Sequence, residues 1–79
     1  MHYTYILRSI SNPDKTYVGY TSNLKARFKT HNSGQSISTA KNIPWKLEFY
    51  SAFDTKEKAL AFEKYLKSGS GKAFTKKHF

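Results

Sequence analysis

A β-hairpin is predicted by residues 3–20, which read YTYILRSISNPDKTYVGY. Tyr3–Ser9 is rich in aromatic and β-branched residues and alternates loosely, as strands do. Ser11–Asp14 is a cluster of turn-forming residues, and Thr16–Tyr20 again has the composition of a strand. Because the connection is short, the two strands are expected to pair in antiparallel fashion. The side chains expected to share a face within each strand are Tyr3, Tyr5 and Leu7 in the first, and Tyr17 and Gly19 in the second.

The residues after the hairpin predict a helix. Its candidate N-caps are Thr21 and Ser22, whose hydroxyls can accept a hydrogen bond from the first turn. The helix is expected to run to about His31 or Asn32, with Gly34 as the residue that stops it.

A loop and a third strand come next. The loop is residues 32–42, where Ser, Thr, Asn, Gly and Gln dominate, and we expect it to be exposed. The strand is Trp45–Tyr50, introduced by Pro44. Its apolar face is expected to consist of Trp45, Leu47 and Phe49.

A second helix and a short C-terminal tail or helix complete the chain. Asp54 and Glu57, three residues apart, resemble a capping box. The helix is expected to run to about Ser68 and to end at Gly69. The predicted order of elements is therefore ββαβα, within a single domain covering residues 1–79.

The composition narrows the class of protein. Lys and Arg number 14 against 5 Asp and Glu, which gives a net charge of +9. Six Tyr and six Phe favour a folded core over a disordered basic tail. The absence of cysteine excludes a disulfide scaffold, a thiolate zinc site and cysteine catalysis. No apolar run reaches the length of a signal peptide or a membrane span, so a small cytoplasmic domain is expected.

The positive charge calls for an anionic partner. The lysines are spread along the chain and interleaved with aromatic residues, whereas a membrane anchor would concentrate them. Nucleic acid is therefore favoured over a membrane, and its binding should depend strongly on salt.

Glu63 stands out on the second helix. When successive residues are placed about 100° apart around the helix, its apolar side chains form one arc, and Glu63 falls inside that arc. A carboxylate there is costly unless something pairs with it. It could be a salt bridge at the rim of the core, or a metal ligand or acid/base group at the edge of a cleft. The residues of the arc are Ala59, Leu60, Phe62 and Leu66.

Arg27 and His31 raise the same question on the first helix. They are four residues apart and flank its apolar stripe of Leu24 and Phe28 on one side. One interpretation is an arginine lying along the edge of the core with its head in water. The other is a phosphate clamp next to a titratable imidazole. The hairpin tyrosines are equally ambiguous, because a phenol packs well in a core but can also act as a general base beside a cation.

Taken in order, these motifs resemble the GIY-YIG endonuclease superfamily, in particular its short single-domain bacterial members. The resemblance covers nearly the whole chain, from Tyr3 to about Lys72. It implies a small α/β (α+β) sandwich in which helices flank a three-stranded antiparallel sheet. The segments that carry it are Tyr3–Leu7, Tyr17–Thr21, the Leu24-x-x-Arg27-x-x-x-His31-Asn32-x-Gly34 pattern, Pro44–Leu47, and Glu63 within Ala61–Lys64.

The resemblance also implies roles for single residues in phosphodiester hydrolysis with one divalent metal, Mg²⁺ or Mn²⁺. Tyr5 would help to orient the attacking water, and Tyr17 is the candidate general base. Gly19 stands where a side chain would crowd the substrate. Arg27 would stabilise charge on the scissile phosphate, and Glu63 would be the single metal-binding carboxylate, which leaves the rest of a Mg²⁺ octahedron to water and phosphate oxygens.

The chain departs from the family pattern at several positions. The first triplet is Tyr3-Thr4-Tyr5 rather than Gly-Ile-Tyr. His31 stands where many members have tyrosine, so that it could serve as base or hydrogen-bond donor. Tyr20 replaces a lysine that contacts phosphate in several members, and no asparagine follows Asn42. The residues expected to bind substrate are Gly19, Tyr20, Lys25, Lys41, Lys67 and Lys72.

Two functions are compatible with these observations. The first is a metal-dependent endonuclease acting on DNA, in branched, damaged or single-stranded form as in repair, with a monomer favoured. The second is a binding module that keeps the cleft without useful turnover. The presence of Tyr17, Arg27 and Glu63 together favours the enzyme.

Overall fold

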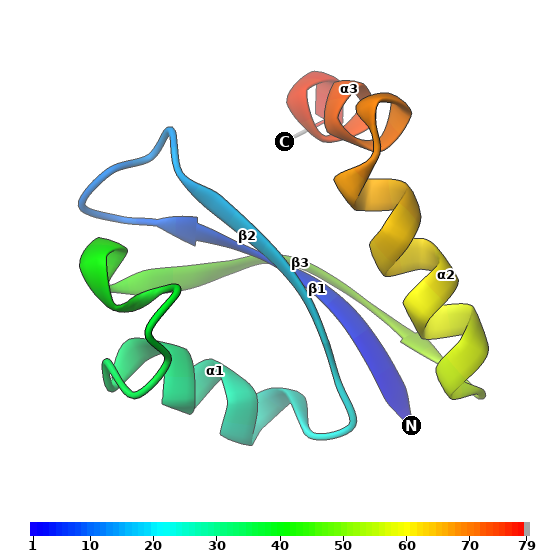
Figure 1. Ribbon diagram of the computed structural model, residues 1–79, viewed down its shortest axis with the longest axis horizontal. Coiled ribbons are helices and arrows are strands. Elements are labelled where there is room, and N and C mark those ends of the chain that lie inside the picture. Colours follow the sequence, from blue (N-terminus) through cyan, green and yellow to red (C-terminus); the bar gives the residue numbers. More distant parts are fainter. Residues whose placement is uncertain (79) are drawn as a thin grey trace.

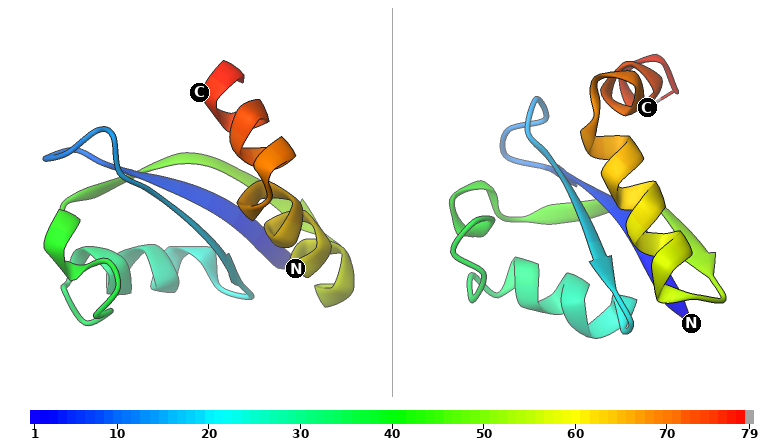
Figure 2. Two further views of the ribbon diagram at one scale, coloured as in Figure 1. Left: turned by 45° about the horizontal axis from the view of Figure 1, so that its top comes forward. Right: turned by 45° about the vertical axis from the view of Figure 1, so that its right-hand side comes forward.

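The computed structural model describes residues 1–78 of the protein. Its three strands form one antiparallel sheet in the order β2-β1-β3. Helix α1 covers one face of this sheet and α2 the other, with α3 following α2 (Figures 1 and 2). This is an α+β fold with the predicted order of elements, to which a third helix is added. The elements are β1 (His2–Ser9), β2 (Thr16–Thr21), α1 (Leu24–Asn32), a 3₁₀ helix (Ala40–Asn42), β3 (Trp45–Phe53), α2 (Lys56–Lys67) and α3 (Gly69–His78).

Strand β1 is the centre of the molecule. It pairs with β2 on one side and β3 on the other, and its residues 4–7 are all buried because a helix covers each face. Tyr5 and Leu7 point to the α1 face, where they pack with Trp45. Thr4 and Ile6 point to the α2 face, and the Thr4 hydroxyl donates a hydrogen bond of 2.5 Å to the carbonyl of Ala59. This bond ties α2 to the central strand.

The prediction that Phe49 shares a face with Trp45 and Leu47 is wrong. Leu7 pairs with Leu47 while the preceding Ile6 pairs with Phe49, so β3 contains one extra residue, Glu48. A bulge of this kind reverses the alternation of side chains beyond it. Phe49 consequently packs on the α2 face, with its ring 6.2 Å from that of Phe62.

The two helix caps also differ from the prediction. Asn23, rather than Thr21 or Ser22, caps α1 by accepting a hydrogen bond from the Ala26 amide. Thr55, rather than Asp54, caps α2 by accepting one from Lys58. Both are Asn or Thr residues within two positions of the predicted cap, and several candidates in a row cannot be distinguished by type alone.

Leu60 was expected on the buried arc of α2 and is instead exposed. The residues of α2 that turn toward the sheet are Ala59, Phe62, Glu63 and Leu66, spaced three and four apart. Glu63 is therefore at the edge of the buried face, with its side chain 21% exposed.

The predicted loop is more ordered than its composition indicates. The loop contains a 3₁₀ helix. Thr39, the loop residue just before this helix, is completely buried. The side-chain amide of Asn32 binds both backbone groups of Trp45, accepting from its nitrogen and donating to its carbonyl. The first residue of β3 is thereby tied to the last residue of α1. The φ of Gly34 is +81°, a conformation that favours glycine and ends α1 as expected.

Gly71 sets the position of α3 against α2. A Cβ at this residue would collide with the carbonyl oxygen of Tyr65 and lie 2.5 Å from the Cα of Leu66. Backbone atoms cannot rotate away, so the two helices approach this closely only because residue 71 has no side chain. The helices are further joined by the rings of Tyr65 and Phe74, 6.4 Å apart.

We expect Gly71→Ala to lower the free energy of unfolding by about 1–3 kcal/mol, since overpacking forces the helices apart. Thermal unfolding followed by circular dichroism measures the loss. Gly69→Ala is the matched control, because nothing lies within 4 Å of a Cβ added at Gly69. An equal loss in both variants would show that helix packing at Gly71 is not the reason.

Candidate active site

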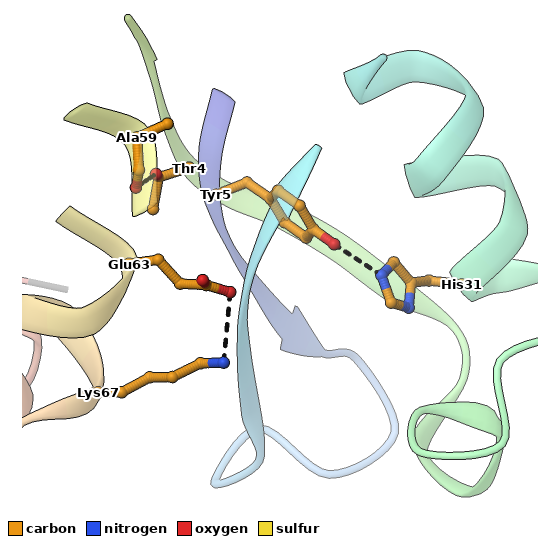
Figure 3. A network of polar contacts seen from close by, with 6 residues as sticks. All are labelled: Thr4, Tyr5, His31, Ala59, Glu63 and Lys67. Atoms are coloured by element: carbon orange, nitrogen blue, oxygen red, sulfur yellow. Dashed lines mark hydrogen bonds and ion pairs between the residues drawn. The ribbon is translucent and has the colours of Figure 1, made fainter. Parts of the chain in front are cut away.

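Tyr5 reaches the α1 side of the sheet by lying over the backbone of β2. Its strand partner is Gly19, where an added Cβ would collide with the Tyr5 hydroxyl and lie 2.6 Å from Cζ and 3.0 Å from the Tyr17 ring. A side chain at residue 19 would thus first crowd the phenols of Tyr5 and Tyr17. Tyr5 itself is 1% exposed, and its hydroxyl lies 2.8 Å from Nε2 of His31 (Figure 3).

His31 is completely buried and uses both ring nitrogens. Its Nδ1 lies 2.8 Å from the Thr39 hydroxyl, and its Nε2 lies 2.8 Å from the Tyr5 hydroxyl. A neutral imidazole donates at one ring nitrogen and accepts at the other, and a hydroxyl can do either. The site therefore contains a hydrogen-bonded chain of Tyr5, His31 and Thr39.

Thr39 was not among the residues predicted for the site. It lies in a stretch of Ser and Thr whose members look alike in the sequence. Only the folded chain places it against His31, while the indole nitrogen of Trp45 donates to its carbonyl and anchors it.

Arg27 completes the cluster. Hydrogen bonding with the Tyr5 phenol raises the pKa of Arg27, against a smaller opposing effect of burial, and Tyr17 acts in the same direction. Tyr17 lies close by, with its ring centroid 4.9 Å from that of His31 and 6.4 Å from that of Tyr5. The structure thus brings together four of the predicted residues, from β1, β2 and α1.

The charge states in this cluster follow from burial and from Arg27. Burial lowers the pKa of His31, and the Arg27 guanidinium lowers it further, so the imidazole is neutral at neutral pH. Burial raises the pKa of Tyr5, while hydrogen bonding from Arg27 opposes that change. In the resting protein Tyr5 is therefore a neutral phenol hydrogen-bonded to a neutral histidine.

The lowered pKa of His31 makes stability dependent on pH. In the unfolded chain the imidazole takes up a proton as pH falls below about 6.5, whereas the buried imidazole resists protonation. The unfolded state then binds more protons, so the free energy of unfolding falls as pH is lowered below that value. We expect the melting temperature to fall between about pH 7.5 and 5.5, and to fall less in His31→Gln. An identical slope in both proteins would contradict this account.

Glu63 approaches from the opposite side of β2. Figure 3 shows its carboxylate directed from α2 toward β2, while Tyr5 extends from β1 toward α1. Its Oε2 pairs with Nζ of Lys67, one helical turn on, at 3.3 Å. The carboxylate is near enough to contribute to the raised pKa of Tyr5, as the smallest of the causes. The salt-bridge interpretation of Glu63 therefore has a partner in Lys67.

The donor chemistry at Glu63 fits a hard cation. Within residues 1–78, no three His, Cys, Asp or Glu side chains gather into a possible metal cage. A single carboxylate that is partly exposed suits Mg²⁺ or Mn²⁺ bound mostly by water and phosphate oxygens. Glu63 would hold such an ion, and Lys67 would have to move away from the carboxylate.

The residues predicted to bind substrate fall into separate groups. Lys67 and Lys72 line a groove that also includes Tyr17. Lys25 lines a different hollow, between α1 and the sheet, and Lys41 is an exposed residue of the 3₁₀ helix. Tyr20 binds Nδ1 of His2 at 2.7 Å through its hydroxyl.

Comparison with known proteins agrees with this arrangement. The family model of the GIY-YIG catalytic domain matches residues 1–77. The chain belongs to the GIY-YIG family. Similar proteins include a UPF0213 protein of Bacillus licheniformis, 39% identical over 72 residues, which are 90% of this chain and 72% of the relative. A UPF0213 protein of Streptococcus pyogenes is 42% identical over 67 residues, 82% of this chain and 70% of the relative.

Membership in the GIY-YIG family supports a nuclease-type function and implies binding of nucleic acid. The printed names of the relatives state no activity. The helices within residues 1–78 include none that is both long enough and apolar enough to span a bilayer.

Proposed function

We propose that this GIY-YIG domain is a metal-dependent endonuclease that hydrolyses phosphodiester bonds in DNA, in the processing or repair of branched or damaged forms. The observation that supports the proposal is the cluster of Tyr5, Tyr17, Arg27 and His31, with the Glu63 carboxylate directed toward the same strand from the other side. A phosphodiester at the edge of β2 would meet the partly exposed Arg27 guanidinium and Tyr17 phenol on one side of the strand and the Glu63 carboxylate on the other.

Arg27 would neutralise the non-bridging oxygens as charge develops on them. The Tyr5 and Tyr17 phenols lie near enough to the guanidinium to raise the pKa of Arg27. Lysine could not replace it fully, because a single ammonium does not reproduce the planar fork of donors.

Tyr17 is the candidate base for the attacking water. It is only partly buried and lies beside Arg27, and a phenol in such a place can take a proton from water. Tyr5 is completely buried and would position its neighbours, with neutral His31 able to accept the Tyr5 proton at Nε2. As water attacks phosphorus, its proton passes to the base and the bond to the leaving oxygen breaks.

Glu63 would hold Mg²⁺ or Mn²⁺ at the edge of the cluster. When bound, the cation would supply Lewis-acid stabilisation of the phosphate and the leaving oxygen.

A nucleic-acid-binding module without turnover is the second candidate. The Glu63–Lys67 ion pair favours it, because the ammonium already satisfies the carboxylate that would hold the metal. Binding would then depend on the basic surface alone.

The test is incubation of labelled single-stranded, duplex and branched DNA with Mg²⁺ or Mn²⁺, with EDTA as control. The endonuclease predicts products that appear with metal and vanish with EDTA. Salt-sensitive binding without cleavage of any substrate would favour the binding module instead.

A further inference from the structure

A groove of about 540 Å³ runs from the candidate active site to the C-terminal helix. Its first wall comes from the hairpin, through Arg8, Asp14 and the start of β2. Its second wall comes from the end of α2 and from α3. Because Tyr17 lines the groove and also belongs to the tyrosine cluster, the groove opens directly onto the proposed site. The lining residues are Arg8, Asp14, Thr16, Tyr17, Val18, Leu66, Lys67, Lys72, Thr75 and Lys76.

The charges in the groove are distributed unevenly. Lys67, Lys72 and Lys76 all lie on the helical wall. The hairpin wall carries Asp14 and Arg8, and Arg8 pairs with Glu48 at 3.3 Å. An extended polyanion would therefore follow the helical wall, where Lys72 and Lys76 offer two ammonium groups to its phosphates and Lys67 pairs with Glu63.

Part of the groove lining is apolar. Tyr17 and Val18 on the hairpin wall and Leu66 on the helical wall stand among the charged residues. A duplex keeps its base faces stacked inside the helix and would leave these apolar groups uncovered. An unpaired base could lie on the ring and the aliphatic groups, in the combination of basic groove and stacking platform typical of proteins that bind single strands. The volume is in the range of clefts that hold one small molecule, about 300–1,000 Å³, and so suits one or two nucleotides.

The helical wall is held in place before any ligand arrives. Gly71 has no side chain and therefore packs directly against the backbone at the end of α2. This close contact fixes the angle between α2 and α3. Lys72 and Lys76, one helical turn apart on α3, consequently stand on the same side of that helix, toward β2.

We propose that this groove binds an unpaired, single-stranded segment of nucleic acid next to the bond that is cleaved. The substrate class is then a nucleic acid with a single-stranded portion, such as an overhang or a branch. The inference rests on the proposed function, since it assumes that the tyrosine cluster receives a phosphodiester.

The test compares two double variants of equal charge. Lys72→Gln/Lys76→Gln removes two groove lysines, whereas Lys29→Gln/Lys64→Gln removes two exposed lysines that do not line the groove. Binding of a labelled single strand, a blunt duplex and a duplex with an overhang is measured by fluorescence anisotropy over a range of salt, with EDTA present to prevent turnover. Cleavage of the overhang substrate with Mg²⁺ is measured in parallel.

We expect the groove variant to bind the single strand roughly tenfold more weakly than the control variant. Its plot of log affinity against log salt should be shallower by about 1.4, two phosphate contacts at about 0.7 each. Affinity for the blunt duplex should change equally in both variants. Equal losses for the single strand in both variants, or an equal loss for single strand and duplex in the groove variant, would overturn the inference.

Failure of the inference is distinguishable from failure of the proposed function. If the wild-type protein cleaves and the two variants behave alike, the groove assignment is wrong and the endonuclease stands. If single-strand binding depends on the groove lysines but nothing is cleaved, the groove stands and the endonuclease is wrong. Absence of any binding by the wild-type protein would overturn both.

Discussion

Replacing Glu63 with glutamine will reduce metal-dependent cleavage by about 10³-fold or more while leaving the fold intact, since a metal supplies several kcal/mol of transition-state stabilisation. Glutamine keeps the size and the packing of the side chain but removes the charge that would hold the cation. The ion pair with Lys67 joins residues four apart with side chains 21% and 55% exposed. Such pairs contribute only about 0.3–0.5 kcal/mol, so stability should hardly change.

Glu57→Gln is the matched control for this experiment. Glu57 lies on the same helix, in its first turn, and is exposed. The substitution removes the same charge at a distance from the cluster, so cleavage should stay at the wild-type rate. Cleavage and melting temperature are measured for both variants. A loss of several kcal/mol of stability in Glu63→Gln, with cleavage unchanged, would instead establish Glu63 as a structural ion-pair partner.

Gly19→Ala is expected to have the second large effect. The added methyl group would occupy the space of the Tyr5 hydroxyl and Cζ. Tyr5 is fully buried and cannot swing into solvent, so its ring must shift and its hydrogen bond to His31 must lengthen or break. We expect a loss of about 1–3 kcal/mol in the free energy of unfolding from overpacking. Cleavage should fall by about 10²-fold or more, as small misplacements in an active site do.

Gly34→Ala separates the two effects. Gly34 has φ of +81°, and nothing lies within 4 Å of a Cβ added to it. Alanine there is strained by roughly 1–2 kcal/mol through its backbone alone, and the residue belongs to the end of α1 rather than to the cluster. Both variants should melt earlier, but only Gly19→Ala should lose cleavage. Equal cleavage in the two would show that the contact between Gly19 and Tyr5 has no role in the reaction.

The local patterns of the sequence predicted the elements well. Strand composition on both sides of Ser11–Asp14 identified the hairpin. The four-residue spacings of Leu24 and Phe28, and of Phe62 and Leu66, identified the helices. These local patterns failed where a neighbouring residue changed the outcome. Phe49 changed face because one extra residue in β3 reverses the alternation, and the caps moved because neighbouring polar residues compete for the same hydrogen bond.

Some residues of the candidate site could be placed from local patterns, and others only from the folded chain. Arg27 and His31 are neighbours on a helix face whatever the rest of the chain does, and Tyr5 and Gly19 become partners once the hairpin register is known. Thr39, by contrast, was indistinguishable from the other hydroxyl residues of its loop, and Arg8 and Lys76 gave no sign that they share a groove.

The sequence by itself determined the order of elements, because strand and helix periods of two and 3.6 act over a few residues. The family and the types of the site residues came from the resemblance of the motifs, in their order and spacing, to the GIY-YIG pattern. Only the tertiary structure decided that Tyr5 lies over Gly19, that Thr39 orients His31, and that α3 stands opposite β2 to form a basic groove. These contacts join residues far apart in the chain. They depend on how the layers pack, on the bulge in β3 and on the close contact between α2 and α3 at Gly71. A local sequence pattern does not contain this information.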